Sequence, residues 1–256
     1  MHIILQNTFC IRLSWRRGND ILANCESVRL FYLLIRQNVC VQSWQSSALR
    51  LKEVSAAAYD ESFEQLPERN VSLSYFLQSY KYFRDVEDQL RVDLTFKRSV
   101  SDTARRWLDN QTPEKWTAVE FARVVIHVRR KDYAQLKHEV DGWPTPTTDY
   151  FRRSMSYFTD CLDRVQFVVL SDDFAWCRKH INATDIVYSS GHSPIVDMAI
   201  ASLCDHAIIT IGSYGWWAAW FANGVTITQK NLPRNGSWLA RRLHRDDYYK
   251  PEWIGL

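Results

Sequence analysis

The strongest constraint on the fold is a regular alternation of strand-like and helix-like segments that begins at residue 121. Its first segment, Phe121–Val128, is an apolar run rich in β-branched residues, typical of a strand buried on both faces of a parallel sheet. Further strands are predicted at Val165–Leu170, Asp185–Tyr188, His206–Ile211 and Val225–Thr228. Helices are predicted between them at Thr148–Leu162, Asp172–Ile181, Pro194–Cys204 and Ser213–Ala222. This alternation predicts an α/β fold with right-handed crossovers and a doubly wound parallel sheet.

The first 120 residues carry weaker patterns. Helices are predicted over residues 20–33, Ser46–Ala58, Tyr80–Leu94 and Ser101–Asn110, and a short strand over residues 71–77. Thr112 and Pro113 form a linker into the first regular strand. We therefore expect two domains, residues 1–116 and residues 117–256.

Composition excludes some classes of protein. A net charge of +3 without a basic run does not favour a nucleic-acid partner. Apolar runs such as Leu30–Ile35 are far shorter than a membrane span. The six cysteines are dispersed without a C-x-x-C pair, which argues against a zinc site. N-glycosylation sequons slightly favour a lumenal compartment, and they begin at Asn70, Asn110, Asn182 and Asn235.

A cationic cluster follows the first strand of the regular half. Arg129 and Arg130 come directly after Phe121–Val128, with His127 just before them and Asp132 just beyond. Open α/β sheets bind ligands beyond the carboxyl ends of their strands, and each guanidinium is a planar fork that fits phosphate oxygens. The cluster therefore indicates a phosphorylated ligand. An Arg129–Asp132 ion pair that ties the strand end to its loop explains the spacing equally well.

Two other strand ends also collect residues that suit a ligand. Asp172 and Asp173 follow the second strand, where they either complement a helix capped by Ser171 or accept hydrogen bonds from a nucleobase or ribose. Asp197, near the start of a later helix, has the same two interpretations. The fourth strand is followed by Gly212, Ser213, Tyr214 and Gly215. Glycines there let backbone approach a ligand, and the helix start offers N–H groups to an anion.

Several chemistries are disfavoured by motifs that the chain lacks. It contains no D-x-D, G-x-S-x-G or H-E-x-x-H, and neither of the glycine-rich nucleotide fingerprints. The aromatic run Trp216–Trp220 is interpreted as helix packing.

The motifs resemble those of one known family. His127-Val-Arg129-Arg130-Lys-Asp132-Tyr133 resembles the H-x-R-R-x-D-Y motif of the galactoside α-1,2-fucosyltransferases, glycosyltransferase family 11, which use GDP-L-fucose. Other segments resemble further motifs of that family: Gln78–Phe83, Pro146–Phe151, Phe167–Asp173 with Trp176, Asp197–Ala219 and Asp247–Trp253. The resemblance covers about residues 71–256, in order.

The resemblance implies two facing Rossmann-like lobes of the GT-B type. Residues 1–116 would form an incomplete acceptor-side lobe, and residues 117–256 the lobe that binds GDP-fucose. The implied reaction moves L-fucose from GDP-fucose to the 2-hydroxyl of a β-galactoside on a glycan, with inversion at the anomeric carbon. The alternative is a catalytically inactive paralogue, or a truncated product, that binds a GDP-sugar or a carbohydrate.

The resemblance also implies roles for the site residues. Arg129 and Arg130 would neutralise the departing diphosphate, assisted by the backbone amides of Gly212–Gly215. His127 would orient the donor or an adjacent carboxylate. Asp172, Asp173 and Asp197 would contact the nucleotide or cap helices.

The base that accepts the acceptor proton is expected to be Asp132, with Glu139 and Asp141 as alternatives. No metal and no cofactor are expected, because fixed guanidiniums would stabilise the leaving group.

Family members begin with a short cytoplasmic tail, one membrane anchor and a glycine-rich segment, none of which is visible before Asp20. The expected location is the lumenal side of the Golgi membrane. The expected partners are GDP-fucose and a galactose-terminated glycan, and no nucleic acid.

Overall fold

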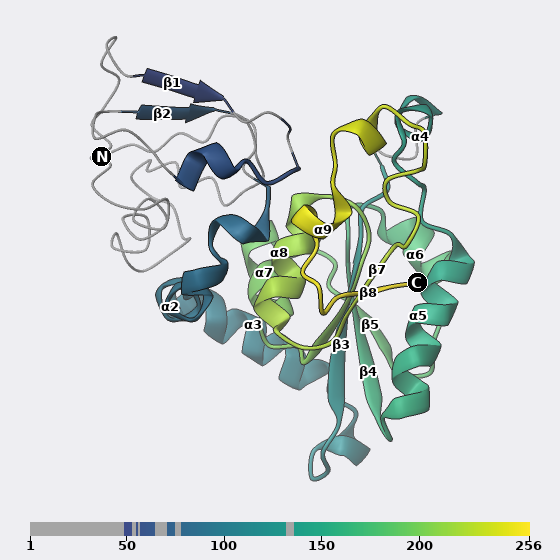
Figure 1. Cartoon of the computed structure of the whole chain (residues 1–256). Helices are drawn as coiled ribbons and strands as arrows, with labels where there is room; N and C mark the ends of the chain where they lie inside the picture. The colour runs from purple at the N-terminus through teal and green to yellow at the C-terminus, as the bar shows by residue number, and fades with distance from the viewer. Residues whose placement is uncertain (1–48, 53–54, 56, 65–70, 75–77, 132–135) are drawn as a thin grey trace. The chain divides into compact units, whose positions relative to one another are not determined.

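The computed structural model describes residues 49–52, 55, 57–64, 71–74, 78–131 and 136–256. Within the chain, residues 1–97 and 240–250 form one compact unit, and residues 98–239 and 251–256 form a second (Figure 1). The helix predicted over residues 20–33 lies outside the described residues.

The first unit contains a short parallel sheet and several single-turn helices. Strand β1 (Leu49–Lys52) pairs with β2 (Val71–Ser74), with Leu49 opposite Val71. The other elements are η1 (Glu61–Glu64), η2 (Tyr80–Tyr82), η3 (Arg84–Val86), α2 (Glu87–Asp93) and α9 (Arg245–Tyr248). Two ion pairs fasten residues 240–250 to the earlier segment: Lys81 Nζ lies 2.6 Å from Asp247 Oδ1, and Lys250 Nζ lies 2.9 Å from Glu87 Oε1.

Two predictions in this unit are corrected. The helix predicted at Ser46–Ala58 is wrong, because residues 49–52 form a strand in which leucine alternates with a basic residue, the period of a strand. The helix predicted at Tyr80–Leu94 is broken into η2, η3 and α2. The breaks fall at Phe83 (φ −135°, ψ 7°) and Val86 (φ −139°, ψ 19°), whose backbones leave the helical region. The strand predicted within residues 71–77 is confirmed as β2.

The second unit is built on a six-stranded parallel sheet in the order β5-β4-β3-β6-β7-β8. Its strands are β3 (Ala122–Val128), β4 (Val165–Ser171), β5 (Ile186–Tyr188), β6 (His206–Ile209), β7 (Thr226–Thr228) and β8 (Ile254–Gly255). From β3 the chain continues outward to β4 and β5, whereas from β6 it continues the other way to β7 and β8. The point between β3 and β6 is therefore the topological switch point of a Rossmann-like sheet.

Helices cover both faces of this sheet (Figure 1). One face carries α3 (Arg98–Gln111), α7 (Pro194–Ala201) and α8 (Ser213–Ala222), and the other carries α5 (Thr148–Cys161) and α6 (Phe174–His180). The remaining short elements are η4 (Glu114–Trp116), α4 (Leu136–Asp141) and η5 (Leu239–Arg241). Because α3 packs against α7, residues 98–116 belong to this unit, whereas the sequence-based division placed them in the first domain.

The core explains why this half of the chain has such a clear sequence pattern. Val124, Ile126 and Val128 of β3 pack in one buried cluster with Phe151 and Phe158 of α5. Phe158 is 2% exposed, so its replacement by alanine is expected to cost about 3–5 kcal/mol. The strands and helices predicted after residue 120 are all present, with ends shifted by a few residues. Strand β8 was not predicted, because two residues give no periodic signal.

None of the helices in the described part of the chain is both long enough and apolar enough to span a bilayer.

Candidate functional site

The site begins where the two central strands of the sheet end. The backbone N–H of Arg129, just past β3, donates to Thr210 Oγ1, just past β6, at 2.9 Å. Gly212 follows with φ 98°, a conformation that side chains rarely adopt. A Cβ on Gly212 would lie 3.4 Å from Arg129 Cδ, an ordinary van der Waals distance. The positive φ, rather than crowding by Arg129, is therefore what favours glycine at this position.

Arg130 is oriented by an aromatic ring. Its guanidinium carbon lies 4.6 Å from the ring centroid of Trp176, on α6, which is a cation–π contact. Its Nε is buried and has no hydrogen-bond partner among the described residues. Leaving a buried donor unsatisfied costs roughly 1–3 kcal/mol, so this N–H is suited to a ligand atom.

The two aspartates after β4 take separate structural roles. Asp172 Oδ1 accepts the backbone N–H of Arg130 at 2.9 Å, and its Oδ2 accepts that of Lys131 at 3.3 Å. Asp173 is the N-cap of α6 and accepts the N–H of Trp176 at 3.1 Å. Ser171, predicted to cap this helix, instead donates to Val128 O at 2.9 Å. The cap is therefore Asp173, while Asp172 holds the chain that carries the arginines.

His127 is buried as a neutral imidazole. It is 5% exposed, and burial followed by the nearby Arg129 charge lowers its pKa to about 3. Its Nδ1 has no hydrogen-bond partner among the described residues. A Cβ on Gly215 would lie 2.4 Å from that nitrogen, so glycine is required beside it. A neutral histidine can orient a neighbour by hydrogen bonding but adds no positive charge.

Helix α8 starts at the same edge of the sheet. Its N-cap is Gly212, which has no side chain to satisfy the first N–H groups. These groups and the helix dipole favour an anion beside Ser213. The Tyr214 ring lies against His127, with ring centroids 5.4 Å apart, and its hydroxyl donates to Pro194 O at 2.6 Å. Burial raises the pKa of Tyr214. Of the residues predicted here, Gly212 and Ser213 present backbone, Tyr214 ties α8 to α7, and Gly215 makes room for His127.

Asp197 lies in a separate polar cluster at the start of α7. It accepts a hydrogen bond from Ser189 Oγ at 2.6 Å, and the same hydroxyl lies 2.9 Å from His192 Nδ1. Burial raises the pKa of Asp197 to about 6. The Asp197 carboxylate in turn raises the pKa of Tyr214, so this cluster adjoins α8.

The structure brings most of the predicted residues to one edge of the sheet, namely His127, Arg129, Arg130, Asp172, Asp173 and Gly212. Asp132 lies outside the described residues, so its pairing with Arg129 stays a prediction. The alternative bases Glu139 and Asp141 lie in α4. Thr210 and Ser189 were not predicted as site residues from the sequence. The signal that could have identified them is a hydroxyl side chain at the end of an apolar strand.

Within the described part of the chain, no group of three or more histidine, cysteine, aspartate or glutamate side chains is arranged to hold a metal ion.

A Rossmann-like sheet with an arginine pair and a glycine-led helix at its switch point is the arrangement of a domain that binds a phosphorylated ligand. The chain belongs to glycosyl transferase family 11, whose profile matches residues 31–256, and this confirms the family predicted from the motifs.

Two curated relatives indicate how much of the chain is shared. Galactoside alpha-(1,2)-fucosyltransferase 1 of Ateles belzebuth is 29% identical over 201 residues, which is 77% of this chain and 55% of that protein. Galactoside 2-alpha-L-fucosyltransferase SEC1 of Bos taurus is 28% identical over 202 residues, 77% of this chain and 54% of that protein. The chain thus spans about half the length of the curated relatives it matches.

Solved structures with a similar chain path include two fucosyltransferases. POFUT1 in complex with GDP has a TM-score of 0.43 and 9% identity, over 66% of this chain and 55% of that one. NodZ alpha-1,6-fucosyltransferase soaked with GDP-fucose has a TM-score of 0.41 and 12% identity, over 77% of this chain and 57% of that one.

Proposed function

We propose that this chain transfers L-fucose from GDP-fucose to the 2-hydroxyl of a β-galactoside on a glycan, with inversion at the anomeric carbon. The observation that carries the proposal is the arginine pair at the switch point, with Arg130 Nε buried and unsatisfied among the described residues. Membership of glycosyl transferase family 11 and the names of the two curated relatives support fucose and galactoside as the sugars.

The chemical difficulty of this reaction is the charge that develops on the departing diphosphate. The sugar becomes oxocarbenium-like as the bond to GDP breaks, and the leaving oxygens gain negative charge. Arg129 and Arg130 are fixed cations at the sheet edge where the diphosphate would lie, and the start of α8 adds backbone N–H donors. Donors held in place before the reaction are effective because they need no reorganisation as the charge appears.

His127 has a positioning role in this mechanism. Because its pKa is lowered to about 3, it is neutral at physiological pH and cannot act as a cationic acid. Its unsatisfied Nδ1, facing the start of α8, orients the donor or an adjacent group by hydrogen bonding.

The base that takes the acceptor's proton is assigned to Asp132, two residues beyond the arginine pair. Glu139 and Asp141 are the alternatives, and they lie on α4 after the same strand. Replacing each carboxylate by its amide and measuring kcat separately from donor affinity distinguishes them. The true base should lose turnover while retaining GDP affinity.

Two measurements test the proposal. Calorimetry with GDP, GDP-fucose and guanosine should show that both phosphorylated ligands bind much more tightly than guanosine. Equal affinity for guanosine and GDP would refute the assignment to phosphate. Incubation with radiolabelled GDP-fucose and a β-galactoside should then yield a labelled product whose linkage NMR identifies as α-1,2.

A second candidate function is binding without transfer. A chain that binds GDP-fucose but transfers nothing would be a GDP-sugar-binding or carbohydrate-binding protein. In the assay above, donor binding without product in the presence of acceptor supports that alternative.

The proposal includes a location on the lumenal side of the Golgi membrane, where this reaction would meet glycan acceptors. Asn110, Asn182 and Asn235 are exposed and begin sequons, so they are accessible to N-glycosylation in the secretory pathway. Expression of the chain behind a secretory signal should give a mobility shift that an N-glycanase reverses. Substitution of all three asparagines by glutamine should abolish the shift from these sites.

A further inference from the structure

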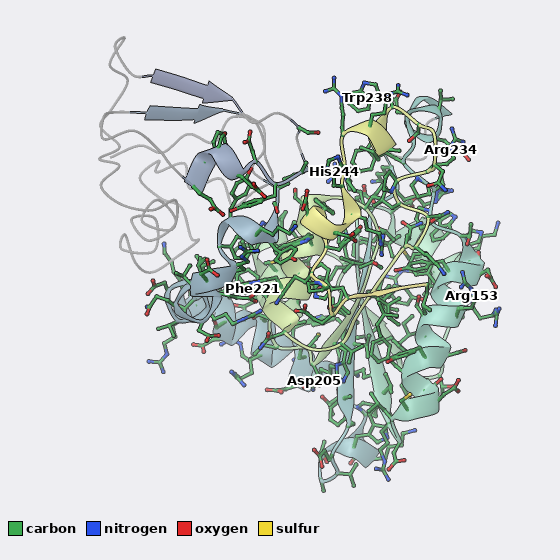
Figure 2. The ribbon with its side chains drawn as sticks, viewed as in Figure 1. Arg153, Asp205, Phe221, Arg234, Trp238 and His244 are labelled. Carbon is green, nitrogen blue, oxygen red and sulfur yellow. The ribbon has the colours of Figure 1, made fainter. Side chains whose placement is uncertain are left out.

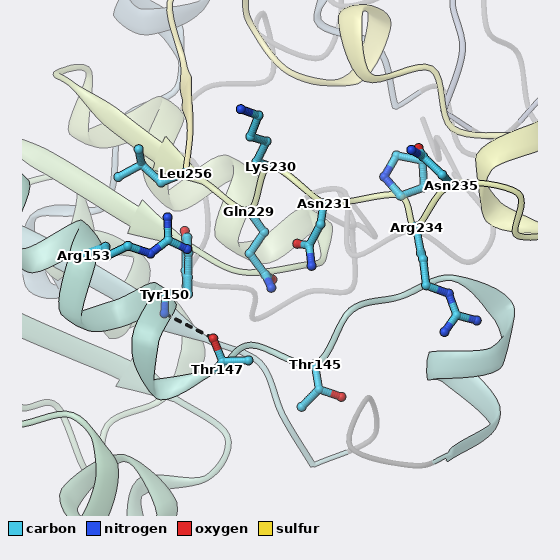
Figure 3. Close-up of a pocket in the computed structure, with 11 residues that line it drawn as sticks. Thr145, Thr147, Tyr150, Arg153, Gln229, Lys230, Asn231, Arg234, Asn235 and Leu256 are labelled. Carbon is cyan, nitrogen blue, oxygen red and sulfur yellow. Dashed lines mark hydrogen bonds between the residues drawn. The ribbon is translucent and has the colours of Figure 1, made fainter.

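A cavity of about 630 Å³ lies at the carboxyl edge of the sheet, beside β7 and β8 rather than at the β3–β6 switch point (Figure 3). This volume is within the range of pockets that enclose a drug-sized ligand. Its lining comes from the start of α5, from the loop after β7 and from the end of β8. The residues assigned to phosphate binding above do not line it.

The walls of this cavity are held by main-chain and buried contacts. The Tyr150 hydroxyl lies 2.7 Å from Ile209 O and 3.2 Å from Ile227 O, which anchors the floor to the ends of β6 and β7. Arg234 N donates to Gly142 O at 3.0 Å, and Lys230 N donates to Leu256 O at 2.9 Å. The cavity is therefore formed before any ligand binds, which lowers the entropic cost of binding.

The middle of the cavity is lined by neutral hydrogen-bonding groups. The side chains of Gln229 and Asn231 point toward the side occupied by Thr145 and Thr147 (Figure 3). Side-chain amides and hydroxyls both donate and accept, as sugar hydroxyls do. The Tyr150 ring is 3% exposed, so it offers no open face on which a nucleobase could stack. The lining therefore suits a polyhydroxylated ligand better than a nucleotide.

The rim carries more basic side chains than acidic ones. Arg153 and Arg234, both labelled in Figure 2, line the cavity together with Lys230, and the lining includes no aspartate or glutamate. Arg153 is already paired, since its Nε lies 2.8 Å from Asp149 Oδ2. The Arg234 guanidinium donates to the backbone carbonyl of Val140 at 3.3 Å, and within the described part of the chain neither it nor the Lys230 ammonium has an ion-pair partner. Two cations that no acidic side chain pairs with among the described residues, beside neutral hydrogen-bonding groups, favour a saccharide that also carries an acidic group.

We propose that this cavity binds an acidic saccharide, that is, a sugar chain bearing a sulfate or a carboxylate. Lys230 and Arg234 would contact the acidic group. The side chains that would contact sugar hydroxyls are Gln229, Asn231, Thr145 and Thr147. The binding itself needs no donor nucleotide. That the saccharide belongs to the acceptor glycan rests on the proposed function.

The test uses the chain made without N-glycans, so that Asn235 stays unmodified, and measures binding by calorimetry without GDP. The probes are 3′-sulfolactose, 3′-sialyllactose, lactose and inorganic sulfate. One or both acidic sugars should bind more tightly than lactose and than sulfate, and the better of the two identifies the acid group. If sulfate binds as tightly as 3′-sulfolactose, the sugar contributes nothing to the affinity, the cavity is a simple anion site, and the proposal is refuted. Lactose binding as tightly as both acidic sugars would refute it too.

Variants assign the binding to the cavity. Lys230→Gln should weaken acidic-sugar binding about fivefold, the effect of one exposed ion pair. Asn231→Asp is isosteric and places a carboxylate among the amides, so it should weaken the acidic sugars but not lactose. Lys179→Gln, an exposed lysine on α6 outside the lining, is the matched control and should change nothing.

GDP affinity, measured on each variant, shows whether the donor site is intact, so a failed sugar titration is distinguishable from failure of the proposed function. Acidic-sugar affinity that survives both Lys230→Gln and Asn231→Asp would overturn the assignment.

Discussion

The carboxylate of Asp172, at the end of β4, accepts the backbone N–H of Arg130, beyond the end of β3, at 2.9 Å. Asp172 therefore positions Arg130 without neutralising its guanidinium, because the hydrogen bond is to the main chain of Arg130. The guanidinium is left to stack on Trp176 and to face a ligand.

We expect Asp172→Asn to weaken GDP binding by about tenfold, since an amide oxygen replaces one charged acceptor and a bond to a charged group contributes about 1.5–3 kcal/mol. Calorimetry with GDP measures the effect. Asp173→Asn is the comparison for stability, because asparagine caps a helix as well as aspartate does. Unchanged GDP affinity in Asp172→Asn would show that the loop does not depend on this bond.

Arg130→Lys should reduce turnover by about 100- to 1,000-fold, the loss typical of removing one transition-state donor. Lysine keeps the charge but loses the planar fork and the stacking on Trp176. Arg178 makes a matched contact outside the site, with its guanidinium carbon 4.6 Å from the Tyr188 ring centroid, so Arg178→Lys is the control. Equal kinetics for wild type and Arg130→Lys would show that the Arg130 guanidinium does not stabilise the departing diphosphate, and would leave that role to Arg129 or to neither arginine.

His127 should stay neutral down to acidic pH, because burial lowers its pKa to about 3. Its NMR signal, assigned by its absence in His127→Gln, should not shift between pH 8 and pH 5.

In the unfolded chain His127 titrates near its ordinary pKa of 6.5. The unfolded state therefore binds more protons as pH falls from 6.5 toward 3, and stability falls by up to about 1.4 kcal/mol per pH unit. His127→Gln should lack that part of the slope.

Asp197→Asn should stabilise the fold at neutral pH. Burial raises the pKa of Asp197 from 3.8 to about 6. The ionised carboxylate therefore lowers the free energy of unfolding above that range. This loss is absent below pH 3.8, where the group is protonated in both the folded and the unfolded chain. The gain should approach about 3 kcal/mol at pH 7 and vanish near pH 3.5. Urea denaturation at the two pH values measures it, and a gain of the same size at both would contradict the assignment. A simultaneous loss of GDP affinity would place Asp197 on the donor.

Fucose transfer should survive excess EDTA and gain little from added Mn²⁺, because the arginine pair would stabilise the diphosphate. The assay uses radiolabelled GDP-fucose and a β-galactoside with and without chelator. Activity that chelation abolishes and metal restores would show that an ion, rather than Arg129 and Arg130, neutralises the leaving group.

The regular half of the fold could be predicted because its strands are buried on both faces. Val124–Val128 are all buried, so the apolar run that the sequence shows is the run that the sheet requires. In the first unit, β1 has only four residues and pairs with β2 at a distance along the chain, and the breaks at Phe83 and Val86 are backbone features that apolar spacing does not report.

The site was predictable in composition but not in its contacts. Arginines at a strand end are visible in the sequence, and so are the aspartates and glycines at neighbouring strand ends. The bond between Arg129 and Thr210 joins residues 81 positions apart, and that between Arg130 and Asp172 joins residues 42 apart. Which aspartate caps and which holds the loop depends on the register of β3 against β4, where Val128 lies opposite Ser171.

The closeness of His127 and Gly215 has a consequence for how such a sequence can change over generations. A Cβ at position 215 would lie 2.4 Å from the imidazole nitrogen, so no single substitution at that position is accommodated while the histidine remains. Loss of the ring would in turn remove the need for glycine. The two positions should therefore be inherited as a pair across related genes, and a lineage that has lost the histidine should be free to lose the glycine as well.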